Sequence, residues 1–201
     1  MMIHLGKALD VATQEEINTD YFNELTFALD EFYAKTPQKA RLDKAIIAEM
    51  IGRVGPKPKI KKVLNYLLSD KDENIRQFSL QSLEYSGTKR PATVLPYIDK
   101  YKNAKDNNMV TTAAYLTAKL LCAPKYPTVL QHMEHWCSPK DSSFLLEVLK
   151  RFVYLLKHGG CQSESLDIDS VSEWVAKKCP TIKRQFNDIL KNIDKEIEPL
   201  S

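Results

Sequence analysis

The amino-acid sequence predicts an all-α protein, an α-solenoid of about five antiparallel helix pairs that forms a single domain over residues 1–201. Apolar residues recur at helical spacing in nearly every segment, whereas strict alternation over a strand length hardly occurs. Pro58, Pro91 and Pro127 suit the first turn of a helix, and they stand 33 and 36 residues apart. A repeat of two helices with a period of about 34 residues is typical of a solenoid.

The first helix pair is expected to end near residue 55. Thr13 can cap the first helix, with Glu16 reaching back to the free amides, and Pro37 should follow its end. The second helix, about residues 38–53, should end at Gly52 and at the Gly55-Pro56 pair, which are stop signals. We expect it to bury four apolar residues, Leu42, Ala45, Ile46 and Met50.

The later pairs follow the same plan. The three prolines open first helices, and second helices are expected at about residues 72–86, 106–122 and 140–158. Asp141 ends a Ser-Pro-Lys-Asp segment that is a good N-cap sequence for the last of these. A fifth pair, about residues 167–178 and 180–197, completes the repeats.

Residues 60–87, IKKVLNYLLSDKDENIRQFSLQSLEYSG, show which solenoid the chain resembles. An apolar first helix ends in two leucines, an Asp lies in the turn, and Ile-Arg follows before a small residue, Ser79, and Leu83. This unit resembles the HEAT repeat, and the resemblance implies a right-handed superhelix. It also implies that Asp70 and Arg76 form a hydrogen-bonded structural ladder between the turn and neighbouring repeats.

Charge and cysteine content bear on the compartment. The net charge of +3 is too small to predict nucleic acid binding. Cys122, Cys137, Cys161 and Cys179 form no CxxC pair, and we expect buried free thiols in a reducing cytosol. With neither a signal peptide nor an apolar run of membrane length, the expected location is the cytoplasm, with no membrane partner.

Two groups of residues invite a functional interpretation. A basic patch, Lys57, Lys59, Lys61 and Lys62, either is a solvated loop and helix face or binds an acidic or phosphate-bearing partner. His132 and His135 would share one face of a helix and could meet a metal ion, but no third ligand is placed. We therefore expect a partly buried helix face there, no metal and no catalytic pair of Cys137 with a histidine.

No nucleotide-binding or catalytic motif occurs, so no cofactor and no catalytic residue are assigned. In HEAT-like arrays the second helices line the concave surface, which the resemblance implies is the binding face. The polar and aromatic residues expected on it are Gln77, Gln81, Tyr115, Lys119, Glu147, Lys150, Arg151 and Tyr154.

We expect a non-catalytic module that binds another protein, as an adaptor, a complex subunit or an inhibitor of immunity type that neutralises its partner. The alternative is a nucleic-acid-binding protein similar to HEAT-like DNA glycosylases for alkylated bases. In that case Trp136, Asp141 and Trp174 would correspond to the tryptophans and the aspartate on the concave face of those glycosylases.

Overall fold

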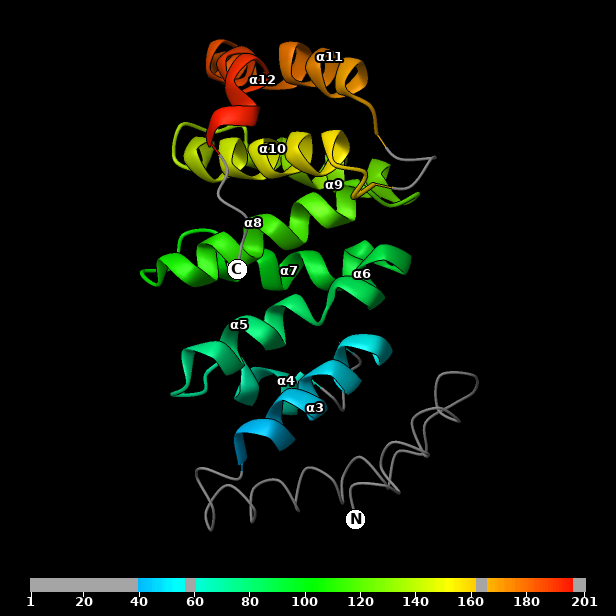
Figure 1. The fold of residues 1–201 in the computed structure, drawn as a ribbon, viewed down its shortest axis with the longest axis vertical. Helices are drawn as coiled ribbons and strands as arrows, with labels where there is room; N and C mark the ends of the chain where they lie inside the picture. Colours follow the sequence, from blue (N-terminus) through cyan, green and yellow to red (C-terminus); the bar gives the residue numbers. More distant parts are fainter. Residues whose placement is uncertain (1–39, 57–60, 162–165, 197–201) are drawn as a thin grey trace. The chain divides into compact units, whose positions relative to one another are not determined.

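The computed structural model describes residues 40–56, 61–161 and 166–196. The helix expected from Thr13 lies outside these residues. Every regular element in the described ranges is helical, which confirms the all-α prediction (Figure 1). In the same ranges, no helix is both long enough and apolar enough to cross a membrane. The helices fall into two compact units, one up to Ser86 and one from Gly87, and each is described by itself. The expectation of a single domain stays a prediction.

In the first unit, α3 (Ala40–Val54) packs against α4 (Lys61–Leu67) and α5 (Glu73–Gln81). The buried side of α3 corrects one detail of the prediction. Met50 is buried as expected, but Ile46 is 36% exposed. Because α3 packs against both α4 and α5, its buried stripe is shifted by one residue from the predicted one. The stripe comprises Ile47, Ala48 and Ile51.

Helix α3 ends at Val54, one residue beyond the predicted end, so Gly55 rather than Gly52 marks its end. A Cβ at Gly52 would lie 2.0 Å from the carbonyl oxygen of Ser82. This glycine therefore serves a close crossing of α3 with the end of α5. Gly55, with φ of +84°, follows the helix end and donates its N–H to the Ile51 carbonyl over 2.8 Å.

The helix expected at about residues 72–86 is interrupted. It comprises α5, a turn at Ser82 and Leu83, and α6 (Glu84–Lys89). Ser82 Oγ donates to the Ser79 carbonyl over 2.9 Å, and Leu83 N donates to the Leu80 carbonyl over 3.2 Å. The Leu83 bond reaches back three residues instead of four, so the helical turn narrows at the place where Gly52 approaches.

The second unit contains α7 (Pro91–Tyr101), α8 (Asn107–Leu121), α9 (Tyr126–Met133), η1 (Glu134–Trp136), α10 (Ser142–Lys157), α11 (Ile168–Lys178), η2 (Pro180–Ile182) and α12 (Lys183–Glu196). Local signals position several of the helix starts. Pro91 opens α7, and Pro127 lies in the first turn of α9. Asp106 and Asp167 cap α8 and α11 by accepting hydrogen bonds from main-chain amides of the first turn.

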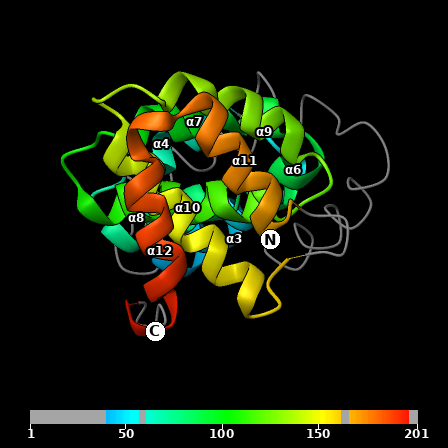
Figure 2. The same ribbon diagram turned by 90° about the horizontal axis from the view of Figure 1, so that it is seen from above.

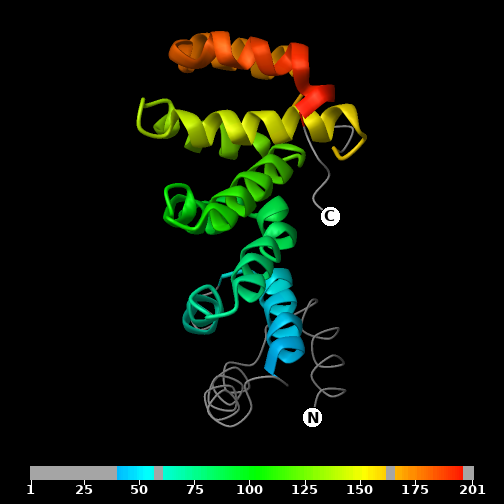
Figure 3. The same cartoon turned by 60° about the vertical axis from the view of Figure 1, so that its left-hand side comes forward.

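The helices of this unit form two rows. Helix α10 packs against α8 on one side and α12 on the other (Figure 3). Helix α7 packs against α8 and α9, and α9 also contacts α8. Viewed from above, α7, α9 and α11 lie on one side of the unit and α8, α10 and α12 on the other (Figure 2). The apolar face of α10 fills the space between the rows, and Phe144, Leu145, Val148, Leu149, Phe152 and Val153 are at most 3% exposed.

Candidate functional site

Helices α8 and α10 run parallel, as contacts at both of their ends show. At the amino-terminal ends, the Asp141 carboxylate before α10 accepts hydrogen bonds from Lys102 Nζ over 2.8 Å and from Asn103 Nδ2 over 2.7 Å. Lys102 and Asn103 come shortly before α8. At the carboxyl-terminal ends, Cys122 after α8 is bonded to Cys161 after α10. Positions counted from the two helix starts therefore lie at similar heights along the pair.

Five of the expected binding residues share the outward side of this pair. Tyr115 and Lys150 each lie nine residues after their N-cap, Asp106 or Asp141, and Lys119 and Tyr154 each lie thirteen residues after it. All four are partly exposed, as is Glu147 one turn before Lys150. We call the five the α8–α10 stripe: Tyr115, Lys119, Glu147, Lys150 and Tyr154.

Contacts along each helix hold several of these side chains. Lys119 Nζ lies 5.6 Å from the centroid of the Tyr115 ring, a cation–π distance. Arg151 forms an ion pair with Glu147 over 2.6 Å, and its side chain is only 16% exposed. Tyr154 stacks on His158 with ring centroids 4.0 Å apart. Arg151 therefore supports the flank of the stripe, whereas the two tyrosine rings are oriented by neighbours one helical turn away.

The remaining expected face residues belong to the first unit. Gln77 donates a hydrogen bond to Glu73 over 2.9 Å, and Gln81 is exposed at the end of α5. Of the basic patch, Lys61 and Lys62 are exposed in the first turn of α4, whereas Lys57 and Lys59 lie outside the described residues.

The Asp70 and Arg76 pair is arranged differently from the ladder that we expected. Arg76 donates to the main-chain carbonyls of Asp70 and Lys71, over 2.9 and 3.1 Å. The Asp70 carboxylate instead accepts hydrogen bonds from Lys44 Nζ, over 2.5 Å, and from the Asp72 amide, over 2.8 Å. Asp70 thus joins α3 to the turn before α5, and Arg76 holds the backbone of the same turn.

His132 and Trp136 meet an aspartate that the sequence analysis did not single out. His132 Nε2 lies 2.7 Å from Asp99 Oδ2, and Trp136 Nε1 donates to Asp99 Oδ1 over 2.8 Å. Trp136 is fully buried, whereas His135 is exposed. In the described ranges, no group of three His, Cys, Asp or Glu side chains could hold a metal ion.

The repeat period was the signal that could have found Asp99. It precedes His132 by 33 residues and Trp136 by 37 residues, close to the predicted period of about 34 residues. Residues one repeat apart lie side by side in stacked helix pairs. The Asp99 contacts therefore join α7 to α9 and η1, and they give this residue group a structural role in the second unit.

Asp141 completes a second polar centre in the same unit. Burial acts to raise the pKa of its carboxyl group. Hydrogen bonds from Lys102 and Asn103, with the positive charges of Lys102 and Lys140, outweigh that effect and hold the pKa below its usual value of 3.8. Asp141 occupies the N-cap position of α10, but its side chain makes no capping hydrogen bond, because it is used in joining α10 to the end of α7.

The cysteines correct the prediction of free thiols. Cys122 is bonded to Cys161 and Cys137 to Cys179, and none of the four remains free. The prediction was wrong because spacing along the chain does not show which residues meet in space. The two disulfides also remove the argument for a reducing cytosol, because disulfides persist mainly in oxidising compartments.

Comparisons with known proteins found no matching family model, no matching curated protein and no matching solved structure.

Proposed function

We propose that this chain is a short HEAT-like α-solenoid that acts without catalysis by binding another protein through the α8–α10 stripe. The observation that carries the proposal is the equivalent placement of Tyr115 with Lys150 and of Lys119 with Tyr154 on two parallel helices. Repeated second helices with aligned outward residues are the usual binding surface of solenoid proteins.

The chemistry of the stripe favours a protein partner. Tyrosine supplies apolar area together with a directional hydroxyl group, and it is enriched at interface hot spots. Lys119 lies over the Tyr115 ring, and Glu147 and Lys150 add charges of both signs to the same stripe. A surface of mixed sign orients a partner with a complementary pattern, whereas a polyanion would require clustered positive charge.

The nucleic acid alternative has less support. Trp136 is fully buried and bonded to Asp99, and Asp141 is held by Lys102 and Asn103. These two side chains are therefore engaged in packing rather than positioned to contact an extruded base.

Site-specific crosslinking tests the proposal. A photoreactive phenylalanine analogue would replace Tyr154 of the stripe or, as the control, Gln131, which is exposed on α9 in the opposite row. We expect a discrete protein adduct from position 154 in native lysate and none from position 131. The adduct would be identified by mass spectrometry and the partner purified.

Calorimetry with that partner provides the decisive measurement. Tyr154→Ala should weaken binding about tenfold or more, and Gln131→Ala should leave it unchanged. Equal crosslinking from both positions, or equal affinity of both variants, would overturn the proposal. Tight, steeply salt-dependent binding of duplex DNA in the absence of a protein adduct would favour the alternative.

A further inference from the structure

Both disulfides of the second unit follow the same plan. Cys122 and Cys161 follow α8 and α10, and Cys137 and Cys179 follow η1 and α11. Their sequence separations are 39 and 42 residues, near the length of one repeat plus a turn. Each bond therefore links two successive helix pairs, one bond in each row of helices.

The two cysteines of each bond differ in accessibility. Cys122 is 4% exposed and Cys179 is fully buried. Cys161 and Cys137 are both partly exposed, and Cys161 follows two exposed glycines. Thiol–disulfide exchange requires the attacking thiolate to reach a sulfur atom of the other reactant, so access decides which sulfur reacts first.

We propose that Cys161 and Cys137 are the sites at which a disulfide oxidant enters the folded chain, with Cys122 and Cys179 as their resolving partners. The oxidant is a disulfide of the glutathione or protein class. This inference does not depend on the proposed binding function.

The exchange proceeds in two balanced steps. The Cys161 thiolate attacks one sulfur of the oxidant, forms a mixed disulfide and releases one oxidant thiolate. Cys122 loses its proton to solvent and attacks the Cys161 sulfur, which forms the intramolecular bond and releases the second oxidant thiolate. Two cysteine thiols are oxidised, and one oxidant disulfide is reduced to two thiols. Cys137 and Cys179 react by the same steps.

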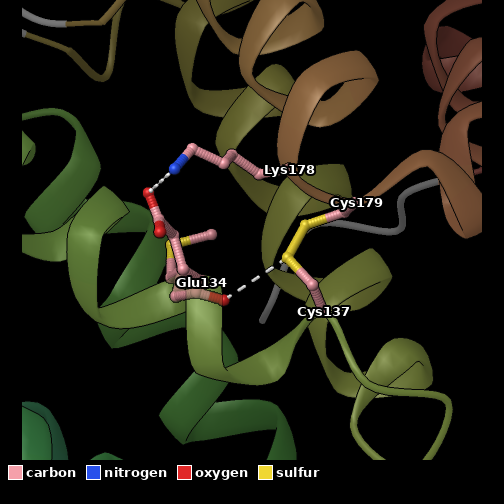
Figure 4. Close-up of a disulfide and its surroundings, with 5 residues drawn as sticks. Glu134, Cys137, Lys178 and Cys179 are labelled. Atoms are coloured by element: carbon pink, nitrogen blue, oxygen red, sulfur yellow. Dashed lines mark hydrogen bonds and ion pairs between the residues drawn. A yellow bond between two sulfur atoms is a disulfide. The ribbon is translucent and has the colours of Figure 1, made fainter.

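Neighbouring contacts keep each pair together before the bond forms. The packing of α10 against α8 holds the first pair. Near the second, Glu134 of η1 and Lys178 of α11 form an ion pair over 2.9 Å (Figure 4). The Cys137 sulfur also lies 3.7 Å from the Met133 carbonyl oxygen, to which a reduced thiol can donate. The resolving thiol is thus preplaced, which makes the second step intramolecular and fast.

Four single variants test the assignment, and each leaves one cysteine without its partner. Cys122→Ser and Cys179→Ser expose the proposed entry cysteines to oxidised glutathione, and Cys161→Ser and Cys137→Ser leave only the buried ones. Intact-mass spectrometry should show one bound glutathione forming faster, on the order of tenfold or more, in the first two variants than in the second two. In denaturant, all four variants should react alike.

Wild-type protein supplies a second measurement in case a variant does not fold. Fully reduced chain would receive a brief pulse of alkylating reagent, followed by peptide mapping. We expect label at Cys161 and Cys137 before Cys122 and Cys179. Equal labelling of both members of a pair under native conditions would overturn the proposal, as would reoxidation by glutathione that yields a different pairing.

Discussion

Gly52→Ala gives a sharp test of how α3 packs in the first unit. The added Cβ would lie 2.0 Å from the Ser82 carbonyl oxygen, 2.4 Å from its carbonyl carbon and 2.8 Å from its Cβ. Comfortable contact requires about 3.5 Å, so α3 and the end of α5 would have to separate by about 1.5 Å. The obstacle is mainly backbone, which cannot rotate away as a flexible side chain could.

The magnitude follows from two opposing effects. Alanine is favoured over glycine inside a helix by about 1 kcal/mol. Overpacking against a fixed backbone costs about 3 kcal/mol or more, and separating the helices also exposes buried side chains such as Ile51. We therefore expect a net loss of about 2–3 kcal/mol in the stability of α3 and α5.

Hydrogen exchange measured by mass spectrometry is the appropriate assay, because it reports on each helix separately. Peptides from α3 and α5 should lose protection by a factor of roughly 30–150, with α10 peptides as an internal reference. Arg53→Ala is the matched control on α3, because Arg53 is exposed and its ion pair with Glu49 contributes little. Unchanged or slower exchange in Gly52→Ala would mean that only helix propensity acts and that the close crossing with Ser82 is wrong.

Three further perturbations have defined outcomes. Replacing both Cys122 and Cys161 by serine should lower the free energy of unfolding by about 4 kcal/mol, because the disulfide closes a loop with a sequence separation of 39. A urea unfolding midpoint equal to that of oxidised wild type would contradict this. Asp141→Asn should lower the free energy of unfolding by about 2 kcal/mol at neutral pH. Because folding lowers the pKa of Asp141, the stability difference between wild type and the variant should persist at pH values above the usual pKa of 3.8. It should shrink as the pH falls through the lower pKa of the folded state. A stability difference that grows in acid would refute the pairing. Arg76→Ala should lower stability by about 1–2 kcal/mol, because the carbonyls of Asp70 and Lys71 lose their hydrogen bonds. Hydrogen exchange in the turn before α5 that matches wild type would exclude this role.

Helix positions could largely be predicted because their signals are local. Asp106 and Asp167 cap helices with their own side chains, and Pro91 begins α7 as its fixed φ requires. Asp141 shows the limit of such signals. It occupies an N-cap position, but Lys102 and Asn103 take its carboxylate, and nothing within four residues of Asp141 could indicate that.

Part of the candidate site could also be predicted. The outward positions of α8 and α10 follow from helical periodicity, and Tyr115, Lys119, Glu147, Lys150 and Tyr154 are partly exposed as that periodicity requires. Their alignment across two helices depends on the parallel packing of α8 and α10, which the resemblance to the HEAT repeat implied but no local signal in either helix specifies.

The sequence by itself determined the helical class, the caps and the outward stripes, because backbone hydrogen bonds and the burial of one face depend on residues a few positions apart. Only the tertiary structure decided that Gly52 serves a helix crossing, that Asp99 holds His132 and Trp136, and that the four cysteines pair. Each of these depends on which side chains the stacking of helices brings within a few ångströms. Such contacts join residues roughly thirty to forty positions apart, beyond the range of local signals.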